Sequence, residues 1–255
     1  MQIKDMVALV TGGGSGLGKA TALRLAAQGA KLAIMDRSAE AAARMAESTG
    51  GLALPADVTD SPAVAAAFGK IAAHYGTAPR ILVNCAGIGT ASRILPRDGS
   101  LSIDTFEQTI KVNLVGTYIL LNHAARAMSA LDPLDADGAR GVIINTASVA
   151  YQDGQIGQAA YAASKGGIAS LTLPAARELA RFGIRVMTIA PGLFETAMSA
   201  GLTPEIRAAL EAGLPFPSRM GKPDEYALLV QSIIENPLLN GEVIRLDSAV
   251  RLAPK

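Results

Sequence analysis

The sequence of 255 residues has little of the chemistry on which metal and disulfide proteins depend. It contains one cysteine, two histidines and no tryptophan. A single Cys85 cannot form an internal disulfide, and no cluster of metal ligands is visible around it, so we predict no metal site. We expect Cys85 to be a small buried residue rather than a reactive thiol. His74 and His123 lack acidic partners nearby in sequence, and we expect them to be surface or helix-packing residues.

The charge and hydropathy patterns exclude further classes. The formal net charge is +1, and no basic cluster or aromatic platform stands out, which argues against nucleic acid as a partner. No apolar run reaches the roughly 18 residues that cross a bilayer, so no membrane span is predicted. The first residues, MQIKDMVALV, lead directly into an apolar strand without a recognisable signal sequence. From this pattern we expect a cytoplasmic protein.

Half of the residues are hydrophobic, and their distribution alternates between short apolar runs and longer helical stretches. This alternation predicts one α/β domain over residues 1–255, a Rossmann-type, doubly wound, seven-stranded and mostly parallel sheet with helices on both faces. The predicted strands are 7–11, 31–36, 52–56, 81–84, 141–146, 184–190 and 243–247. The predicted helices are 17–28, 38–48, 62–75, 104–129, 158–181 and 224–235.

A glycine-rich turn follows the first strand. Gly12, Gly16 and Gly18 would permit a sharp turn, the approach of a pyrophosphate to backbone N–H groups, and close packing of the next helix. The spacing is GxxxGxG rather than GxGxxG, so the general dinucleotide fingerprint is met only loosely. The order of strand, turn and helix still favours a dinucleotide site.

The second predicted strand ends at Asp36, where a carboxylate would accept hydrogen bonds from the adenosine ribose and repel the additional phosphate of NADP. Arg37 could instead hold that phosphate. Because the carboxylate occupies the more direct position, we favour NAD as the cofactor.

Three residues in the middle of the chain predict proton transfer at an alcohol. Tyr161 and Lys165 are four residues apart, so a helix would place both on one face. The neighbouring ammonium would favour the phenolate and lower the pKa of Tyr161 toward the working range of a general base. Ser148 could present a hydroxyl to the same reacting oxygen. Each residue alone has a structural alternative, a strand-end cap for Ser148 or an exposed helical position for Tyr161 and Lys165.

Together the motifs TGGGSGLG, Asp36, NCAG at 84–87, Asn113, Ser148, the Tyr161–Lys165 pair and Pro191-Gly192 resemble the short-chain dehydrogenase/reductase family along nearly the whole chain. The stretches GVIINTASVA, GQIGQAAYAASKGGI, GIRVMTIAPGLF and NGEVIRLD resemble the 3-hydroxyacyl-CoA dehydrogenase type 2 branch, also called 17β-hydroxysteroid dehydrogenase type 10.

The resemblance implies a role for each site residue. Tyr161 would be the proton-transfer group, Lys165 would hold the nicotinamide ribose, and Ser148 would bind the substrate oxygen. Asn113, which could also be a helix residue bonded to backbone, would anchor a water, and Gln158 would touch substrate. The residues implied to bind the cofactor are Gly12, Ser15, Gly16, Leu17, Gly18, Asp36, Asp57, Val58, Cys85, Ala86, Gly87, Tyr161, Lys165, Pro191, Phe194 and Thr196.

Three segments rich in loop residues complete the plan. Residues 193–219 are expected to form a substrate lid with a short amphipathic helix, whose apolar side is either packing or an acyl-chain wall. Residues 89–103 and 130–140 are read as loop insertions. The first is better placed to border the substrate, whereas the second is expected to be a surface connection.

The function that this resemblance implies is NAD-dependent oxidoreduction of a short or branched 3-hydroxyacyl-CoA, with hydroxysteroids as possible further substrates. Other readings are a different alcohol dehydrogenase, an NADPH-linked 3-oxoacyl carrier-protein reductase, a non-catalytic nucleotide sensor, and a scaffold role beside catalysis. Asp36 argues against NADPH, and the Tyr161–Lys165 pair argues against a sensor. The resemblance further implies a homotetramer with the C-terminal segment near a subunit contact.

Overall fold

A seven-stranded parallel sheet forms the centre of the protein. In the computed structural model, which describes residues 1–196 and 203–254, the strand order is β3-β2-β1-β4-β5-β6-β7, with every neighbouring pair parallel. The predicted fold is therefore confirmed, and the sheet is parallel throughout. The strands are β1 (Val7–Thr11), β2 (Lys31–Asp36), β3 (Leu52–Pro55), β4 (Ile81–Asn84), β5 (Gly141–Thr146), β6 (Ile184–Pro191) and β7 (Val243–Leu246).

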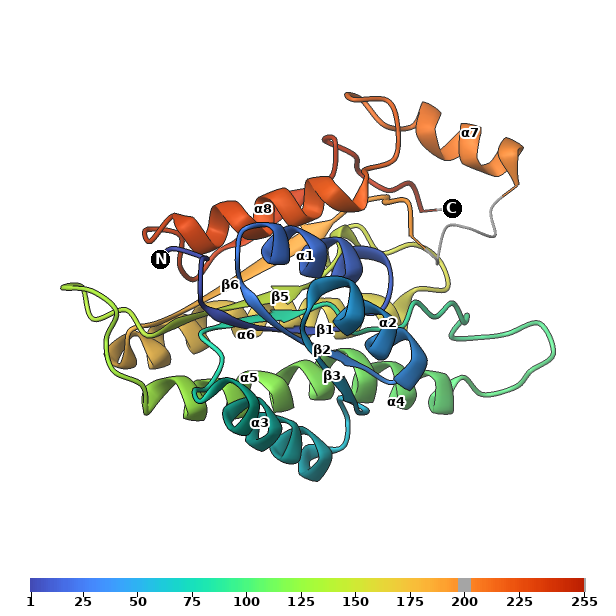
Figure 1. The fold of residues 1–255 in the computed structure, drawn as a ribbon. Helices are drawn as coiled ribbons and strands as arrows, with labels where there is room; N and C mark the ends of the chain where they lie inside the picture. The colour runs from blue at the N-terminus through green and yellow to red at the C-terminus, as the bar shows by residue number, and fades with distance from the viewer. Residues whose placement is uncertain (197–202, 255) are drawn as a thin grey trace.

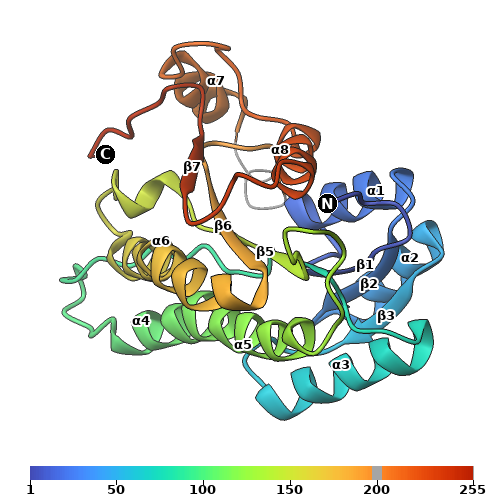
Figure 2. The ribbon, with the colours of Figure 1, turned by 90° about the vertical axis from the view of Figure 1, so that its left-hand side faces the viewer.

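Helices cover both faces of this sheet (Figures 1 and 2). One face carries α1, α2 and α8, and the other carries α3, α4, α5 and α6, while α7 projects beyond the sheet. Their bounds are α1 (Gly16–Ala27), α2 (Ala39–Thr49), α3 (Ser61–Tyr75), α4 (Ile103–Ile110), α5 (Gly116–Ser129), α6 (Ala159–Leu179), α7 (Pro204–Ala212) and α8 (Pro223–Glu235).

Alternation along the strands divides the interior into two hydrophobic cores. In β1, Leu9 packs with side chains of α3 and α5, whereas Ala8 and Val10 pack with side chains of α1 and α8. Successive side chains of a strand point to opposite faces, so a strand buried on both sides reads as a continuous apolar run. This explains why VALVT and GVIINT are apolar at nearly every position and fully buried.

One predicted helix is divided in the structure. The stretch 104–129 forms α4 and α5, joined by a π-helical segment at Lys111–Val115 that contains Asn113. A π-helical turn commonly marks a functional position, and here it displaces the register between the two helices. The predicted helix 158–181 begins one residue later, because Gln158 is its N-cap, and it ends in a short 3₁₀ turn.

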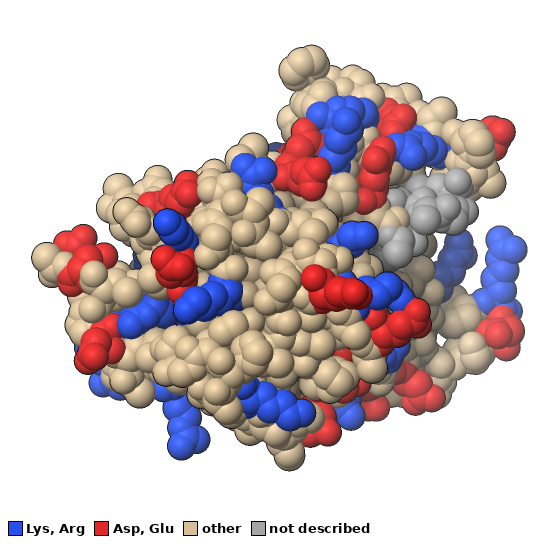
Figure 3. All heavy atoms as spheres, viewed as in Figure 1, with Lys and Arg blue, Asp and Glu red and all other residues tan. Residues whose placement is uncertain are grey.

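Loops carry the two predicted insertions. No helix or strand occurs at 89–102 or 130–140, in agreement with the prediction for these segments. Charged side chains of both signs are interspersed over the face seen in Figure 3. Among the described residues, no helix is both long and apolar enough to span a membrane.

Candidate active site

A cavity of about 680 Å³ opens at the edge of the sheet where the strands end. Residues that follow β1 through β6 line it, which is the position at which ligands bind in doubly wound α/β folds. Of the predicted site residues, all except Asn113 contribute to the lining. These are Gly12, Ser15, Gly16, Leu17, Gly18, Asp36, Asp57, Val58, Cys85, Ala86, Gly87, Ser148, Gln158, Tyr161, Lys165, Pro191, Phe194 and Thr196.

The glycine turn between β1 and α1 leaves no space for side chains. Gly12 has a φ of +61°, and a Cβ there would lie 2.9 Å from backbone atoms of Ala86. A Cβ on Gly18 would lie 2.2 Å from the carbonyl oxygen of Gly12. These contacts bring the N-terminus of α1 close to the cavity, and its N-cap residue Ser15 makes no side-chain hydrogen bond to the first turn. A helix N-terminus exposed in this way favours an anionic group such as a pyrophosphate.

Two carboxylates stand at the ends of β2 and β3. Asp36 lines the cavity and accepts hydrogen bonds from the backbone N–H groups of Gly14, at 3.0 Å, and Ser38, at 2.9 Å. Asp57 also lines the cavity, and the backbone N–H and hydroxyl of Thr59 both donate to its Oδ1 at 2.8 Å. The backbone hydrogen bond is the main reason why the pKa of Asp57 lies below its ordinary value. Each Asp36 oxygen retains a lone pair for a further donor.

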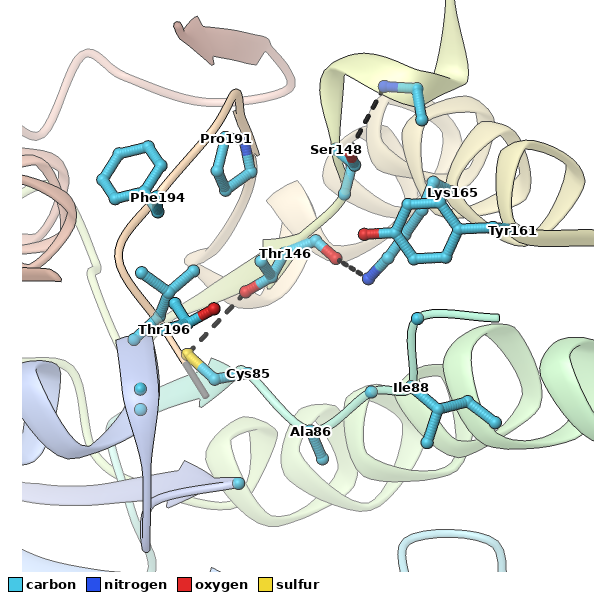
Figure 4. Close-up of a pocket in the computed structure, with 18 of the residues that line it drawn as sticks. Cys85, Ala86, Ile88, Thr146, Ser148, Tyr161, Lys165, Pro191, Phe194 and Thr196 are labelled. Carbon is cyan, nitrogen blue, oxygen red and sulfur yellow. Dashed lines mark hydrogen bonds between the residues drawn. The ribbon is translucent and has the colours of Figure 1, made fainter. Parts of the chain in front are cut away.

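Tyr161 and Lys165 extend from α6 toward the cavity (Figure 4). The Lys165 ammonium lies 5.7 Å from the centre of the Tyr161 ring and donates to the Thr146 carbonyl at 2.8 Å. Lys165 is only 5% exposed, and this burial lowers its pKa from 10.5 to about 8. The ammonium is therefore charged at neutral pH but close to its titration range, with donors left for a ligand.

Ser148 follows β5 and lies beside Tyr161 at the cavity (Figure 4). Its Oγ accepts a hydrogen bond from the Ala150 N–H at 3.2 Å, so it caps the short 3₁₀ turn at Val149–Tyr151. The same hydroxyl hydrogen-bonds Tyr161 and acts to lower its pKa. Ser148 thus both caps the 3₁₀ turn and contacts Tyr161 in the site.

The predicted shift of the Tyr161 pKa has the wrong sign. Burial raises the pKa of this phenol above 10, and the hydrogen bond with Ser148 opposes that shift only in part. The sequence argument considered the charge of Lys165 and omitted the cost of removing a phenolate from water. The burial of Tyr161 therefore raises its pKa and favours the protonated phenol, the form that can donate a proton.

Asn113 lies beneath the cavity rather than in its lining. It is fully buried, its Oδ1 accepts from the Ile88 N–H at 2.8 Å, and its Nδ2 donates to the Ile88 carbonyl and the Ser164 hydroxyl, each at 3.0 Å. These bonds connect the π-helical segment to the loop after β4 and to α6. The side chain therefore positions two cavity walls, and its contact with a water stays a prediction.

Sequence reasoning missed a buried polar group behind Lys165. The Thr146 hydroxyl lies 2.6 Å from the Asn84 carbonyl and 2.7 Å from the hydroxyl of Tyr226, a fully buried residue of α8. Cys85 joins this group at 3.7 Å from Tyr226, and burial raises the pKa of its thiol. The raised pKa disfavours the thiolate, which supports the prediction that Cys85 is not a reactive thiol, although the residue is of intermediate exposure and lines the cavity. A tyrosine in an apolar helix stretch gave no signal of this contact.

The predicted lid is described in part, because residues 197–202 lie outside the described residues. Leu193, Phe194 and Thr196 line the cavity after β6, and Leu210 of α7 lines it from the other end of the segment. Phe194 forms a β-bridge with Gly221, where a Cβ would overlap the phenyl ring at 2.7 Å. Because Leu210 of α7 lines the cavity, the structure favours an acyl-chain wall over plain packing as the role of the apolar side of this helix.

A buried ammonium, a phenol and a hydroxyl beside a glycine turn form the site of a dinucleotide-dependent oxidoreductase that acts at an alcohol or carbonyl oxygen. The family model described as short chain dehydrogenase matches residues 6–207, and the chain belongs to this family. Membership in it implies a nicotinamide cofactor.

Full-length relatives agree with this assignment. The chain is 50% identical to "3-hydroxyacyl-CoA dehydrogenase type-2" of Bos taurus, over 99% of this chain and 97% of the relative. Identity to the protein of the same name in Drosophila melanogaster is 48%, over 99% and 100%. A solved structure, of 3-hydroxyacyl-CoA dehydrogenase type-2 from Mycobacterium avium, superposes with a TM-score of 0.92 at 41% identity, covering 98% of this chain and 97% of that chain.

The residues present fit a nicotinamide dinucleotide. Gly12 and Gly18 leave a cradle that a Cβ would fill, and a Cβ on Gly87 would come within 3.1 Å of Asn113 Oδ1 and 3.6 Å of Lys165 Nζ. Asp36, at the end of β2, offers acceptors, and Lys165, on α6, offers donors, while the glycine turn follows β1, which lies between β2 and β5 in the sheet. These polar groups therefore match two sets of ribose hydroxyls and a diphosphate at the glycine turn.

Proposed function

We propose that this protein is an NAD-dependent 3-hydroxyacyl-CoA dehydrogenase that interconverts short or branched 3-hydroxyacyl-CoA and 3-oxoacyl-CoA. The observation that carries the chemistry is the convergence of Ser148, Tyr161 and Lys165 in the cavity that also holds the glycine turn and Asp36. The substrate class is taken from the full-length relatives, whose names specify 3-hydroxyacyl-CoA.

Each residue then has a defined task. A bound nicotinamide cofactor would supply the hydride chemistry, with NAD⁺ as the hydride acceptor in alcohol oxidation and NADH as the hydride donor in ketone reduction. Tyr161 donates its proton to the forming alkoxide during reduction and removes the hydroxyl proton during oxidation. Ser148 hydrogen-bonds the same substrate oxygen. Lys165 binds the nicotinamide ribose through the ammonium donors that Thr146 leaves available and stabilises the phenolate that forms when Tyr161 gives up its proton.

Burial makes the Tyr161 phenolate costly. The charge of Lys165 therefore matters in both directions, because the phenolate is the base in oxidation and forms when Tyr161 donates its proton in reduction. Because the pKa of Lys165 is about 8, the ammonium is charged at neutral pH and loses its proton in mildly alkaline solution. We expect the reductive rate to fall as pH rises through this range. In Lys165→Met, the reductive rate should be lower at every pH, and its fall in mildly alkaline solution should disappear.

The choice of NAD rests on Asp36, whose carboxylate would repel the additional phosphate of NADP. Arg37 also lines the cavity and offers a cation to that phosphate, which keeps NADPH as the competing cofactor. Asp36→Asn should therefore narrow the preference for NADH over NADPH, by roughly tenfold or more if one charge-assisted hydrogen bond is lost. Comparison of KM for the two cofactors measures this change.

The deciding experiment follows the absorbance of NADH or NADPH in the presence of acetoacetyl-CoA. We expect the wild type to oxidise NADH rapidly. In Tyr161→Phe, kcat should fall by about 10²-fold to 10⁴-fold, which is the usual contribution of a general acid. NADH binding, measured by its fluorescence, should persist in that variant. Tyr118→Phe is the matched control, since Tyr118 lies on α5 with 54% of its surface exposed.

Failure of these outcomes would separate the alternatives. An active Tyr161→Phe variant would remove the catalytic assignment. NADPH oxidation with a 3-oxoacyl carrier protein but not with the CoA ester would favour the reductase, and bound NADH without turnover of any ketone would favour a nucleotide sensor. The homotetramer and the cytoplasmic location stay predictions, which sedimentation and cell fractionation would test.

A further inference from the structure

The C-terminal segment, residues 248–254, folds back over the loop between the 3₁₀ turn at Val149–Tyr151 and α6. Figure 2 shows the end of the chain beside the segment that leads into α6. Ser248 and Ala249 have φ values of 53° and 61°, and the Val250 N–H donates to the Asp247 carbonyl at 3.0 Å, so a tight turn reverses the chain after β7. Val250 is then buried at 4% exposure.

Two hydrogen bonds fix the end of this segment to the loop. Gln155 Nε2 donates to the Ala253 carbonyl at 2.9 Å, and the Ile156 N–H donates to the Pro254 carbonyl at 3.0 Å. Leu252 stands between the turn and these bonds and lines the same cavity as Gln155, Gln158 and Tyr161. The segment is thus a wall of the cavity, next to the loop that carries Gln158.

Arg245 holds this wall in place. One of its terminal nitrogens lies 2.6 Å from the Asp153 carboxylate, 2.7 Å from the Asp247 carboxylate and 2.9 Å from the Val250 carbonyl, and the other lies 2.9 Å from Gln152. The side chains of Arg245, Asp153 and Asp247 are only 15%, 13% and 9% exposed. Charge-assisted bonds in such a poorly hydrated place are stronger than those on the surface. The strand, the loop and the C-terminal segment therefore form one fixed unit.

We propose that Leu252 determines how long and how branched an acyl chain the cavity accepts. This inference rests on the proposed function and adds a specificity residue to it. Leu252 is an apolar residue of the lining on a segment that is hydrogen-bonded to Gln155, a polar residue of the same lining, so it supplies an apolar surface for the acyl group. The bonds of Arg245 to Asp153, Asp247 and Val250 keep this wall from moving away from the cavity. A longer acyl chain must therefore compete with the side chain of Leu252 for space.

The test measures kcat/KM with acetoacetyl-CoA, 2-methylacetoacetyl-CoA, 3-oxohexanoyl-CoA and 3-oxodecanoyl-CoA. In Leu252→Ala the ratio of long-chain to acetoacetyl-CoA turnover should rise by about tenfold or more, and in Leu252→Phe it should fall, since each methylene in such a pocket changes the rate by roughly 10-fold to 200-fold. The shift should appear mainly in KM. Leu238→Ala is the matched control, because Leu238 is 90% exposed and does not line the cavity.

Chain-length ratios that are equal in the wild type, Leu252→Ala and Leu252→Phe would overturn the proposal. If the wild type binds NADH but turns over no acyl-CoA, the proposed function is wrong whatever the role of Leu252. A binding measurement then tests separately whether Leu252 forms a wall of the cavity. In NAD-saturated protein, the apolar fluorophore anilinonaphthalene sulfonate should bind more tightly to Leu252→Ala and less tightly to Leu252→Phe than to the wild type. Equal affinities in all three proteins would overturn the wall as well.

Discussion

The cavity has two sides that differ in how firmly the chain holds them. The sheet side consists of the glycine turn, the strand ends and α6, where Lys165 is 5% exposed and hydrogen-bonded within the protein, and Asn113 supports it from beneath at 0% exposure. The loop side consists of residues 89–103, the described parts of 193–219, and 248–254. Ile94, Leu95 and Phe216 on this side are 80%, 80% and 84% exposed. Groups that transfer a proton need fixed positions, whereas groups that select a substrate tolerate variation.

The C-terminal segment is a firmly held part of the loop side, and Arg245→Met would test it most strongly. This variant leaves the carboxylates of Asp153 and Asp247 poorly hydrated and without their cation, which we expect to cost about 3–5 kcal/mol of unfolding free energy. Urea unfolding would measure the loss. Arg251→Met is the control, because Arg251 is 65% exposed and also contacts Asp247, and its effect should stay below about 1 kcal/mol. Equal losses of unfolding free energy in Arg245→Met and Arg251→Met would contradict the conclusion that Arg245 holds the C-terminal segment in place.

On the sheet side, Lys165→Met should stabilise the protein while it inactivates the enzyme. Burial lowers the pKa of Lys165 from 10.5 to about 8, so the folded state binds fewer protons than the unfolded state between these values. Wild-type stability therefore rises with pH across this window. The gain of the variant should reach up to about 3 kcal/mol below pH 8 and disappear toward pH 10.5. Unfolding curves that differ equally at pH 7 and pH 10.5 would refute this explanation.

Gly18→Ala would test how tightly the glycine turn is built. A Cβ 2.2 Å from the Gly12 carbonyl oxygen forces α1 away from β1, and we expect a loss of about 1–3 kcal/mol together with weaker NADH binding. Gly69→Ala is the matched control, since Gly69 lies within α3 and no atom would approach its Cβ within 4 Å. That variant should gain about 0.5–1 kcal/mol in unfolding free energy.

The smallest effect is expected at the exposed loop. Ile94→Ser removes an apolar side chain that is 80% exposed, and the unfolding free energy should change by less than about 0.5 kcal/mol. Ile34→Ala in the core is the comparison, with an expected loss of about 2–5 kcal/mol. A large loss of unfolding free energy in Ile94→Ser would show that the Ile94 side chain is covered by protein in solution.

The strands could be predicted because each is a continuous apolar run bounded by glycine, proline or polar residues. The runs at 7–11, 31–36, 81–84 and 141–146 were predicted with the observed bounds. The π-helical segment could not be predicted, because it depends on bonds from Asn113 to Ile88 and Ser164, which are distant in sequence. Local propensity carries no information about such contacts.

The site shows the same division between local and tertiary signals. The spacing of Tyr161 and Lys165 predicted their common helix face, since it depends only on helix geometry. The direction of the Tyr161 pKa shift was wrong because burial is a tertiary property. Tyr226 and Leu252 gave no signal at all. Leu252 is an ordinary aliphatic residue in a short segment after the last strand, and only the fold brings it to the cavity.

The position of the cavity at the edge of the sheet has a consequence for how such a protein can change over generations. Ser148, Tyr161, Lys165 and Leu252 belong to neither of the two large hydrophobic cores that cover the faces of the sheet. Substitutions at residues of the loop side that lie outside these cores can therefore alter substrate choice without disturbing the packing that keeps the chain folded. A mutant library restricted to residues 89–103, 203–219 and 250–254 should consequently yield many folded members with new substrate preferences.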